Sequence, residues 1–117
     1  MNPRVPPLAV RRAFQRGVDL YDAGYGGRGL RDNTVAWARR LAAGGAIDRA
    51  KADLMRGWIA RHGASPREAR ARARDGKSPA SVAWLLWGAD PAIHHARRGW
   101  RDPLAAWLSR VIESFER

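Results

Sequence analysis

The sequence predicts an all-α fold: a compact bundle of six or seven short helices around a tryptophan-rich core, with no sheet. Apolar residues recur three and four positions apart in several segments. Proline or glycine, often beside a capping Ser or Asp, separates those segments. No window alternates apolar and β-branched residues with polar ones over the length of a strand.

Length and composition restrict the class of protein. The chain has 117 residues, with 22 Lys and Arg against 11 Asp and Glu, and a formal net charge of +11. We expect one domain, residues 1–117, with an N-terminal arm at 1–6 and a glycine-rich loop at 23–32. No apolar run is long enough to span a membrane or typical of a secretory signal. The absence of cysteine excludes disulfides, thiol catalysis and thiolate zinc sites.

The first predicted helix begins after the prolines at 6–7 and ends in the glycines of 24–29, which favour neither helix nor strand. Gly17 lies inside this helix and marks a close helix crossing. One helical face carries the apolar residues and consists of Val10, Phe14, Gly17, Val18 and Tyr21.

Two further helices are predicted before the middle of the chain. We expect the segment 34–43 to be helical, capped by Asp32 or Asn33 and ended by the glycines at 44–45. Asp48 is the expected cap of the next helix, which Gly63 ends. Its apolar face consists of Leu54, Met55, Trp58, Ile59 and His62.

The second half of the chain repeats one helix-start signal, a capping Ser or Asp followed by proline. The signal occurs at Ser65-Pro66, Ser78-Pro79, Asp90-Pro91 and Asp102-Pro103. After the first of these, Glu68 is placed to complete a capping box.

Two of the helices that these signals start are strongly apolar. The run Ala83-Trp84-Leu85-Leu86-Trp87 is apolar all round, which predicts a buried central helix. The last helix carries a stripe that packs on the domain's own core or, alternatively, forms a dimer or docking face. The stripe consists of Leu104, Trp107, Leu108, Val111, Ile112 and Phe115.

The segment from Ser78 to Asp90, SPASVAWLLWGAD, resembles a signature of small bacteriophage-encoded helical proteins of unassigned function. In those proteins Ser-Pro precedes an apolar-Ala-Trp-x-Leu-Trp-Gly-Gly-Asp core. With the looser matches at 36–45 and 55–62, the resemblance covers about residues 7 to 100. Ala89 and the histidines at 94–95 depart from the pattern. The resemblance implies a phage or prophage origin, with a location in the host cytoplasm or the virion, and it implies no activity.

The excess of positive charge predicts a polyanionic partner, and we expect DNA or RNA to bind through arginine-rich helix surfaces and backbone electrostatics. Arg67, Arg70 and Arg74 share one helical face between slim alanines. The alternative for each basic cluster, including that at 11–16, is a solvated helix face. The predicted nucleic-acid contacts are Arg67, Arg70, Arg72, Arg74, Lys77, Arg97, Arg98, Trp100, Arg101, Arg39 and Arg40.

Trp100 lies between arginines and either stacks on a base or packs at a helix end. The other five tryptophans are assigned to the core. A helix-turn-helix within residues 65–87 is disfavoured, because its second helix presents Trp and Leu where a groove requires polar side chains.

The chemistry of catalysis has little support in the sequence, and we predict no enzyme, no cofactor and no metal site. The loop at 24–29 matches neither the P-loop nor the dinucleotide-binding pattern. His62, Asp90 and the histidines at 94–95 are the only metal-like set, and adjacent histidines diverge by about 100° on a helix.

Two other function classes remain open. The protein is alternatively a virion structural or assembly component, or a small inhibitor or adaptor that binds a host protein. In either case the helix 104–115 is a candidate surface for self-association.

Overall fold

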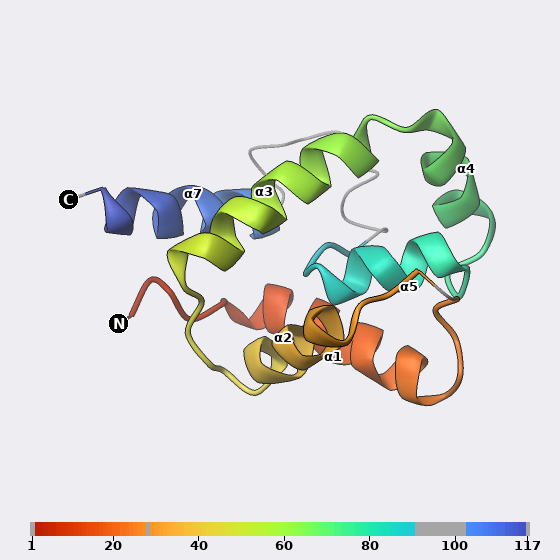
Figure 1. Cartoon of the computed structure of the whole chain (residues 1–117), viewed down its shortest axis with the longest axis horizontal. Coiled ribbons are helices and arrows are strands. Elements are labelled where there is room, and N and C mark those ends of the chain that lie inside the picture. Colours follow the sequence, from red (N-terminus) through yellow and green to blue (C-terminus); the bar gives the residue numbers. More distant parts are fainter. Residues whose placement is uncertain (1, 28, 91–102, 117) are drawn as a thin grey trace.

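The computed structural model confirms the all-α class. It describes residues 2–27, 29–90 and 103–116, which form six helices and no strand (Figure 1). The helix expected after Asp90-Pro91 lies outside the described residues. Within the described part of the chain, no helix combines the length and the apolar composition needed to cross a membrane. The helices are α1 (Leu8–Asp22), α2 (Asp32–Ala42), α3 (Arg49–Gly63), α4 (Pro66–Arg74), α5 (Pro79–Leu86) and α7 (Pro103–Phe115).

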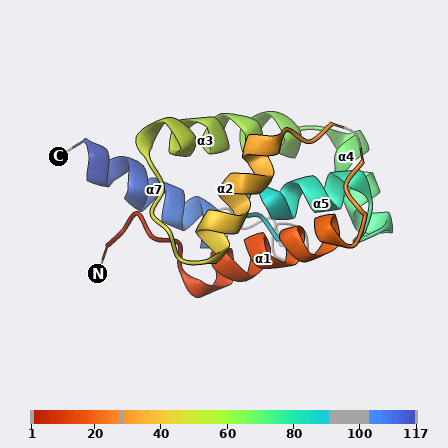
Figure 2. The same ribbon diagram turned by 60° about the horizontal axis from the view of Figure 1, so that its bottom comes forward.

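The helix α5 is the centre of the molecule, as its apolar sequence predicts. It lies between α1 and α3 (Figure 2), and Trp84, Leu85 and Leu86 have no exposed surface. Burial of each such side chain stabilises the fold by about 1.5–3 kcal/mol. Trp84 and Leu86 join α5 to a core to which all the described helices except α4 contribute.

The crossing of α1 over α5 depends on Gly17. A Cβ atom at this position would lie 2.8 Å from the backbone nitrogen of Leu86 and 2.9 Å from the carbonyl carbon of Leu85. Gly88, just after α5, is in a similar position, because a Cβ there would lie 2.7 Å from Cζ of Phe14. The predicted close crossing is therefore confirmed, and glycines on both segments make it possible.

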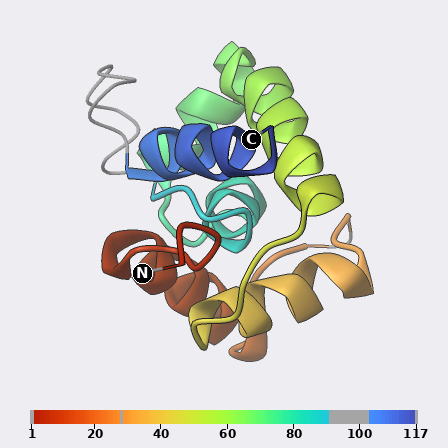
Figure 3. The ribbon, with the colours of Figure 1, turned by 90° about the vertical axis from the view of Figure 1, so that its left-hand side faces the viewer.

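The N-terminal arm packs against α7 (Figure 3). The indole Nε1 of Trp107 donates a hydrogen bond to the carbonyl of Pro3 at 2.8 Å, and the guanidinium of Arg4 lies 3.6 Å from the ring centre of Phe115. The apolar stripe of α7 packs on the domain's own core, with Leu104, Trp107, Leu108 and Val111 buried.

Three predicted helix caps are confirmed. The cap side chains accept backbone N–H bonds three residues further on, which satisfies one otherwise unpaired donor in each first turn. The pairs are Asp48 with Lys51 at 2.7 Å, Ser65 with Glu68 at 3.3 Å, and Ser78 with Ser81 at 3.2 Å.

The predicted cap of α2 is wrong. The helix begins at Asp32, so Arg31 occupies the cap position and makes no side-chain cap bond. The N–H of Thr34 bonds to the carbonyl of Arg31 at 3.0 Å instead. Asp32 lies in the first turn, where its charge is favourable at the positive end of the helix dipole.

Replacing Gly17 by Ala tests the crossing. The added methyl meets backbone atoms of α5 that cannot move independently, so we expect the free energy of unfolding to fall by about 1–3 kcal/mol. Urea unfolding followed by circular dichroism measures this change.

The matched control is Gly57→Ala on α3, where the only close atom is the flexible end of Arg61 at 3.3 Å. There the better helix propensity of alanine should raise stability by about 0.5–1 kcal/mol. Equal effects at both positions would contradict the role of Gly17 in the crossing.

Candidate functional site

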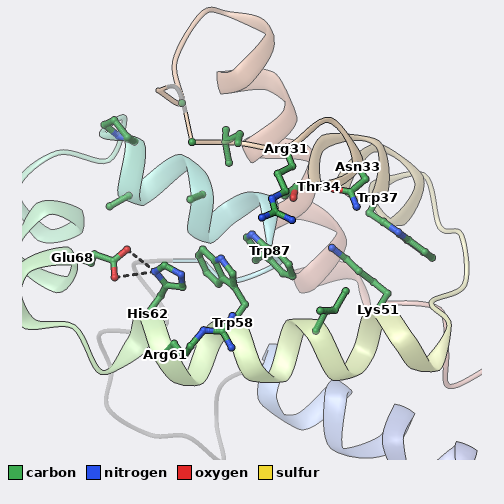
Figure 4. Close-up of a pocket in the computed structure, with 17 residues that line it drawn as sticks. Arg31, Asn33, Thr34, Trp37, Lys51, Trp58, Arg61, His62, Glu68 and Trp87 are labelled. Atoms are coloured by element: carbon green, nitrogen blue, oxygen red, sulfur yellow. Dashed lines mark hydrogen bonds and ion pairs between the residues drawn. The ribbon is translucent and has the colours of Figure 1, made fainter.

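An open cleft of about 550 Å³ lies between α3 on one side and α2 with its preceding glycine-rich loop on the other (Figure 4). The helix α5 also lines it, and Glu68 of α4 stands at one end. The predicted glycine-rich loop 23–32 forms part of the cleft wall. Its residues that line the cleft are Gly26, Gly29, Leu30 and Arg31.

Three tryptophans that the sequence assigned to the core pack against it and also line the cleft. Trp37, Trp58 and Trp87 are half-buried, whereas Trp84 and Trp107 are fully buried. The rings of Trp58 and Trp87 stack with centres 4.9 Å apart and planes at 9°. The prediction is confirmed in part for these three residues: each packs against the buried core, but α2, α3 and α5 do not close over their rings.

Lys51 is a buried cation in this cleft, with only 4% of its surface exposed. Its ammonium lies 3.9 Å from the ring centre of Trp87 and 6.0 Å from that of Trp37. In the described ranges the ammonium itself forms no hydrogen bond or ion pair, and only the backbone N–H of Lys51 is bonded, to Asp48. Burial lowers the pKa of Lys51 to about 8, although the charge of Asp48 acts in the opposite direction. The rings attract the ammonium by cation–π interaction, and no carboxylate among the described residues forms an ion pair with it.

The sequence-based prediction missed Lys51, although a signal was present. Lys51 precedes Leu54, Met55 and Trp58 by three, four and seven residues, so it lies on the apolar face of α3. The side chain of a lysine on such a face can extend to solvent or be buried, and the packing of the neighbouring helices buries Lys51.

His62 and Glu68 form a hydrogen-bonded contact that joins α3 to α4. The imidazole Nδ1 lies 2.7 Å from one carboxylate oxygen of Glu68 and 3.0 Å from the other. Both side chains are about one-third exposed and line the cleft. The capping box is therefore only half formed: Ser65 caps α4, but the carboxylate of Glu68 bonds to His62.

His62 stacks on Trp58, with ring centres 4.1 Å apart. Figure 4 shows the rings of His62, Trp58 and Trp87 in a row between Glu68 and Lys51. In the parts of the chain that the structure describes, no three His, Asp or Glu side chains form a group that could hold a metal ion. The histidines at 94–95 lie outside those parts.

The predicted arginine face of α4 is open to solvent at Arg67, Arg70 and Arg74. Arg72 is different, and its prediction as a nucleic-acid contact is wrong. It is 5% exposed and its guanidinium lies 4.0 Å over the ring of Trp84, because α4 packs this side on α5. Burial lowers the pKa of Arg72 below its usual value.

The other predicted contacts divide into separate environments. Arg39 is exposed but bonds to the carboxylate of Asp22 at 2.9 Å, and this bond lowers the pKa of Asp22. Arg40 lies 4.9 Å from the ring centre of Trp37, at the edge of the cleft, and Lys77 lies 5.1 Å from that of Tyr25. The predicted contacts outside the described residues are Arg97, Arg98, Trp100 and Arg101.

Comparison with known proteins gave no match to a family model, a curated protein or a solved structure. The resemblance of residues 78–90 to bacteriophage proteins stays a prediction. The chemistry of the cleft and the charge around it therefore carry the functional proposal.

The pH dependence of stability tests the environment of Lys51. Its pKa is about 8 in the folded chain and about 10.4 in the unfolded chain, so between these values the unfolded chain binds more protons. The free energy of unfolding of the wild type should therefore rise from about pH 8 to about pH 10.

In Lys51→Met this rise should be absent, and the variant should be more stable than the wild type at neutral pH, because no buried charge is desolvated. Urea unfolding at neutral and alkaline pH measures both chains. A parallel pH dependence in the two chains would contradict the buried position of Lys51.

Proposed function

We propose that the protein binds single-stranded nucleic acid in this cleft, with an unpaired base on Trp37 and phosphates on the cations. The observation that carries this proposal is the ammonium of Lys51, which is buried against Trp87 and lines an open cleft. A phosphodiester supplies the negative charge that this environment lacks.

The aromatic walls of the cleft suit bases. Trp37, Trp58 and Trp87 are half-buried. The two faces of Trp58 are covered by His62 and Trp87, and Trp87 lies between Trp58 and the ammonium of Lys51, so among the described residues Trp37 is the cleft tryptophan on which no other ring stacks. Stacking of a base on an aromatic ring contributes about 1–3 kcal/mol and accepts any base. The volume of about 550 Å³ falls in the range of small-ligand sites, which suits a unit the size of a nucleotide.

Several cations lie in the cleft or close to it. Arg31 and Arg61 are exposed and line the cleft, Arg40 lies beside Trp37, and Lys77 lies beside Tyr25 near the glycine-rich loop. These cations provide binding positions for the phosphates next to a stacked base. The net charge of +11 adds long-range attraction.

A single strand fits the cleft better than a duplex. Paired and stacked bases in a duplex hide the faces that Trp37 would contact. A duplex would therefore meet only exposed cations, such as the α4 arginine face of Arg67, Arg70 and Arg74, and its binding would depend on backbone charge alone.

Lys51→Met tests the site. We expect the dissociation constant for a labelled single strand to rise about tenfold or more, because the variant has no buried ammonium to bind a phosphate. Fluorescence anisotropy with single-stranded DNA, single-stranded RNA and duplex DNA at about 150 mM salt measures this change.

The matched control is Arg110→Gln, which removes the same unit of charge from an exposed position on α7. Its affinity should stay within about twofold of the wild type, since a single exposed charge contributes little at this salt concentration. Equal losses in both variants would reduce the proposal to general attraction between charges. No binding to either single strand would overturn it in favour of virion assembly or a host-protein partner.

Charge reversal of Arg67, Arg70 and Arg74 to Glu tests whether a longer strand continues from the cleft onto α4. We expect weaker binding of a long strand and a smaller salt slope, by about 0.7 for each phosphate that α4 no longer binds. A strand that fills only the cleft should bind the triple variant almost as well as the wild type. Unchanged affinity for both strands, with helicity retained, would exclude the α4 face.

A further inference from the structure

We propose that the same cleft cleaves RNA at a phosphodiester beside a 2′-hydroxyl, with His62 as the general base; this inference rests on the proposed binding of single strands. Glu68 is the positioning residue and Arg61 is the cation at the reacting phosphate. The reaction needs no metal and no cofactor.

The geometry of His62 suits a base. Both carboxylate oxygens of Glu68 lie within 3.0 Å of Nδ1, so the carboxylate accepts the Nδ1 proton and the neutral ring carries its lone pair on Nε2. In the described part of the chain Nε2 has no hydrogen-bond partner, and the ring lines the cleft. Stacking on Trp58 fixes the orientation of the His62 ring.

The chemistry balances without a further reactant. Nε2 of His62 removes the proton of a 2′-hydroxyl, and O2′ attacks the adjacent phosphorus. The bond from phosphorus to the 5′-oxygen of the next nucleotide breaks, which leaves a 2′,3′-cyclic phosphate and a 5′-hydroxyl. The leaving 5′-oxygen gains one proton from water or from the imidazolium, so the proton taken from O2′ is replaced.

Arg61 provides the charge that this reaction requires. The phosphorane formed by the attack carries one more negative charge than the diester, and a guanidinium stabilises it by paired hydrogen bonds. Arg61 precedes His62 on α3, is exposed and lines the cleft. Its guanidinium lies near Gly57, one turn before His62 on α3, and the exposed side chain is free to turn toward a phosphate at His62.

Lys51 has a different part in this arrangement. Its ammonium contacts Trp87, and Trp58 separates Trp87 from His62. Because two indole rings lie between Lys51 and His62, the ammonium cannot reach the phosphate at which His62 acts. It holds a neighbouring phosphate, so its removal should raise KM and leave kcat nearly unchanged.

A purely structural role is the alternative for this pair, since the His62–Glu68 bond also joins α3 to α4. His62→Asn separates the two roles. The amide Nδ2 of asparagine stands close to the position of Nδ1 and can donate to Glu68, but asparagine provides no basic nitrogen. The bond between the helices is thus kept while the base is removed.

The experiment incubates end-labelled single-stranded RNA, and DNA of the same sequence, with the full chain in the presence of EDTA. We expect RNA to be cut to fragments with 2′,3′-cyclic phosphate and 5′-hydroxyl ends, and DNA to be bound but not cut. His62→Asn, purified identically to exclude a contaminating ribonuclease, should lower kcat by about 10²–10⁴-fold. Its affinity for the DNA strand, measured by anisotropy, should stay at the wild-type value.

Glu68→Gln should lower kcat with little change in KM, because the amide still contacts His62 but does not stabilise the imidazolium. RNA that stays intact while DNA and RNA both bind would overturn this inference and leave the proposed binding in place. Cleavage that is equal in the wild type and His62→Asn would also overturn it. Failure of both strands to bind would overturn the proposed function itself.

Discussion

The close approach of α1 and α5 is the constraint on which the rest of the structure depends. Gly17 allows the backbone of α5 to reach α1, and Gly88 allows Phe14 of α1 to fill the space after α5. Each approach uses the absence of a side chain, so the two helices have little freedom to rotate or slide. This fixes which side of α5 faces the core and which side is left for other contacts.

The cleft is a consequence of that orientation. Trp84 is turned into the protein, where it packs with the guanidinium of Arg72, whereas Trp87, three residues later, lines the cleft beside Lys51. The ring of Trp58 contacts both tryptophans, edge-on to Trp84 and stacked on Trp87, and so connects the core to the site. One helix thus supplies the centre of the fold and part of the surface that we propose for nucleic acid.

The two buried cations have different roles because their surroundings differ. Arg72 lies between α4 and α5, where its stack on Trp84 is part of how the two helices pack. Lys51 is buried without an ion pair among the described residues, its pKa is lowered by burial, and it lines an open cleft. A buried charge with a shifted pKa at a cleft is typical of a binding site. The contact between His62 and Glu68 at the other end adds a group that can transfer a proton.

Local rules in the sequence determined the helices: the caps at Asp48, Ser65 and Ser78, the apolar α5 and the stripe of α7 all depend on residues within a few positions of each other. The close crossing at Gly17 was also predictable, because a glycine inside an apolar helical stripe weakens the helix and is favourable mainly where another backbone approaches.

Only the tertiary structure decided which tryptophans are fully buried, that Arg72 turns inward and that the carboxylate of Glu68 bonds to His62 instead of to the N-terminus of its own helix. Helical periodicity assigns a residue to a face, but the neighbouring helices decide whether that face is covered. The candidate site consists of residues on faces that α2, α3 and α5 leave partly open, and that property belongs to no single segment.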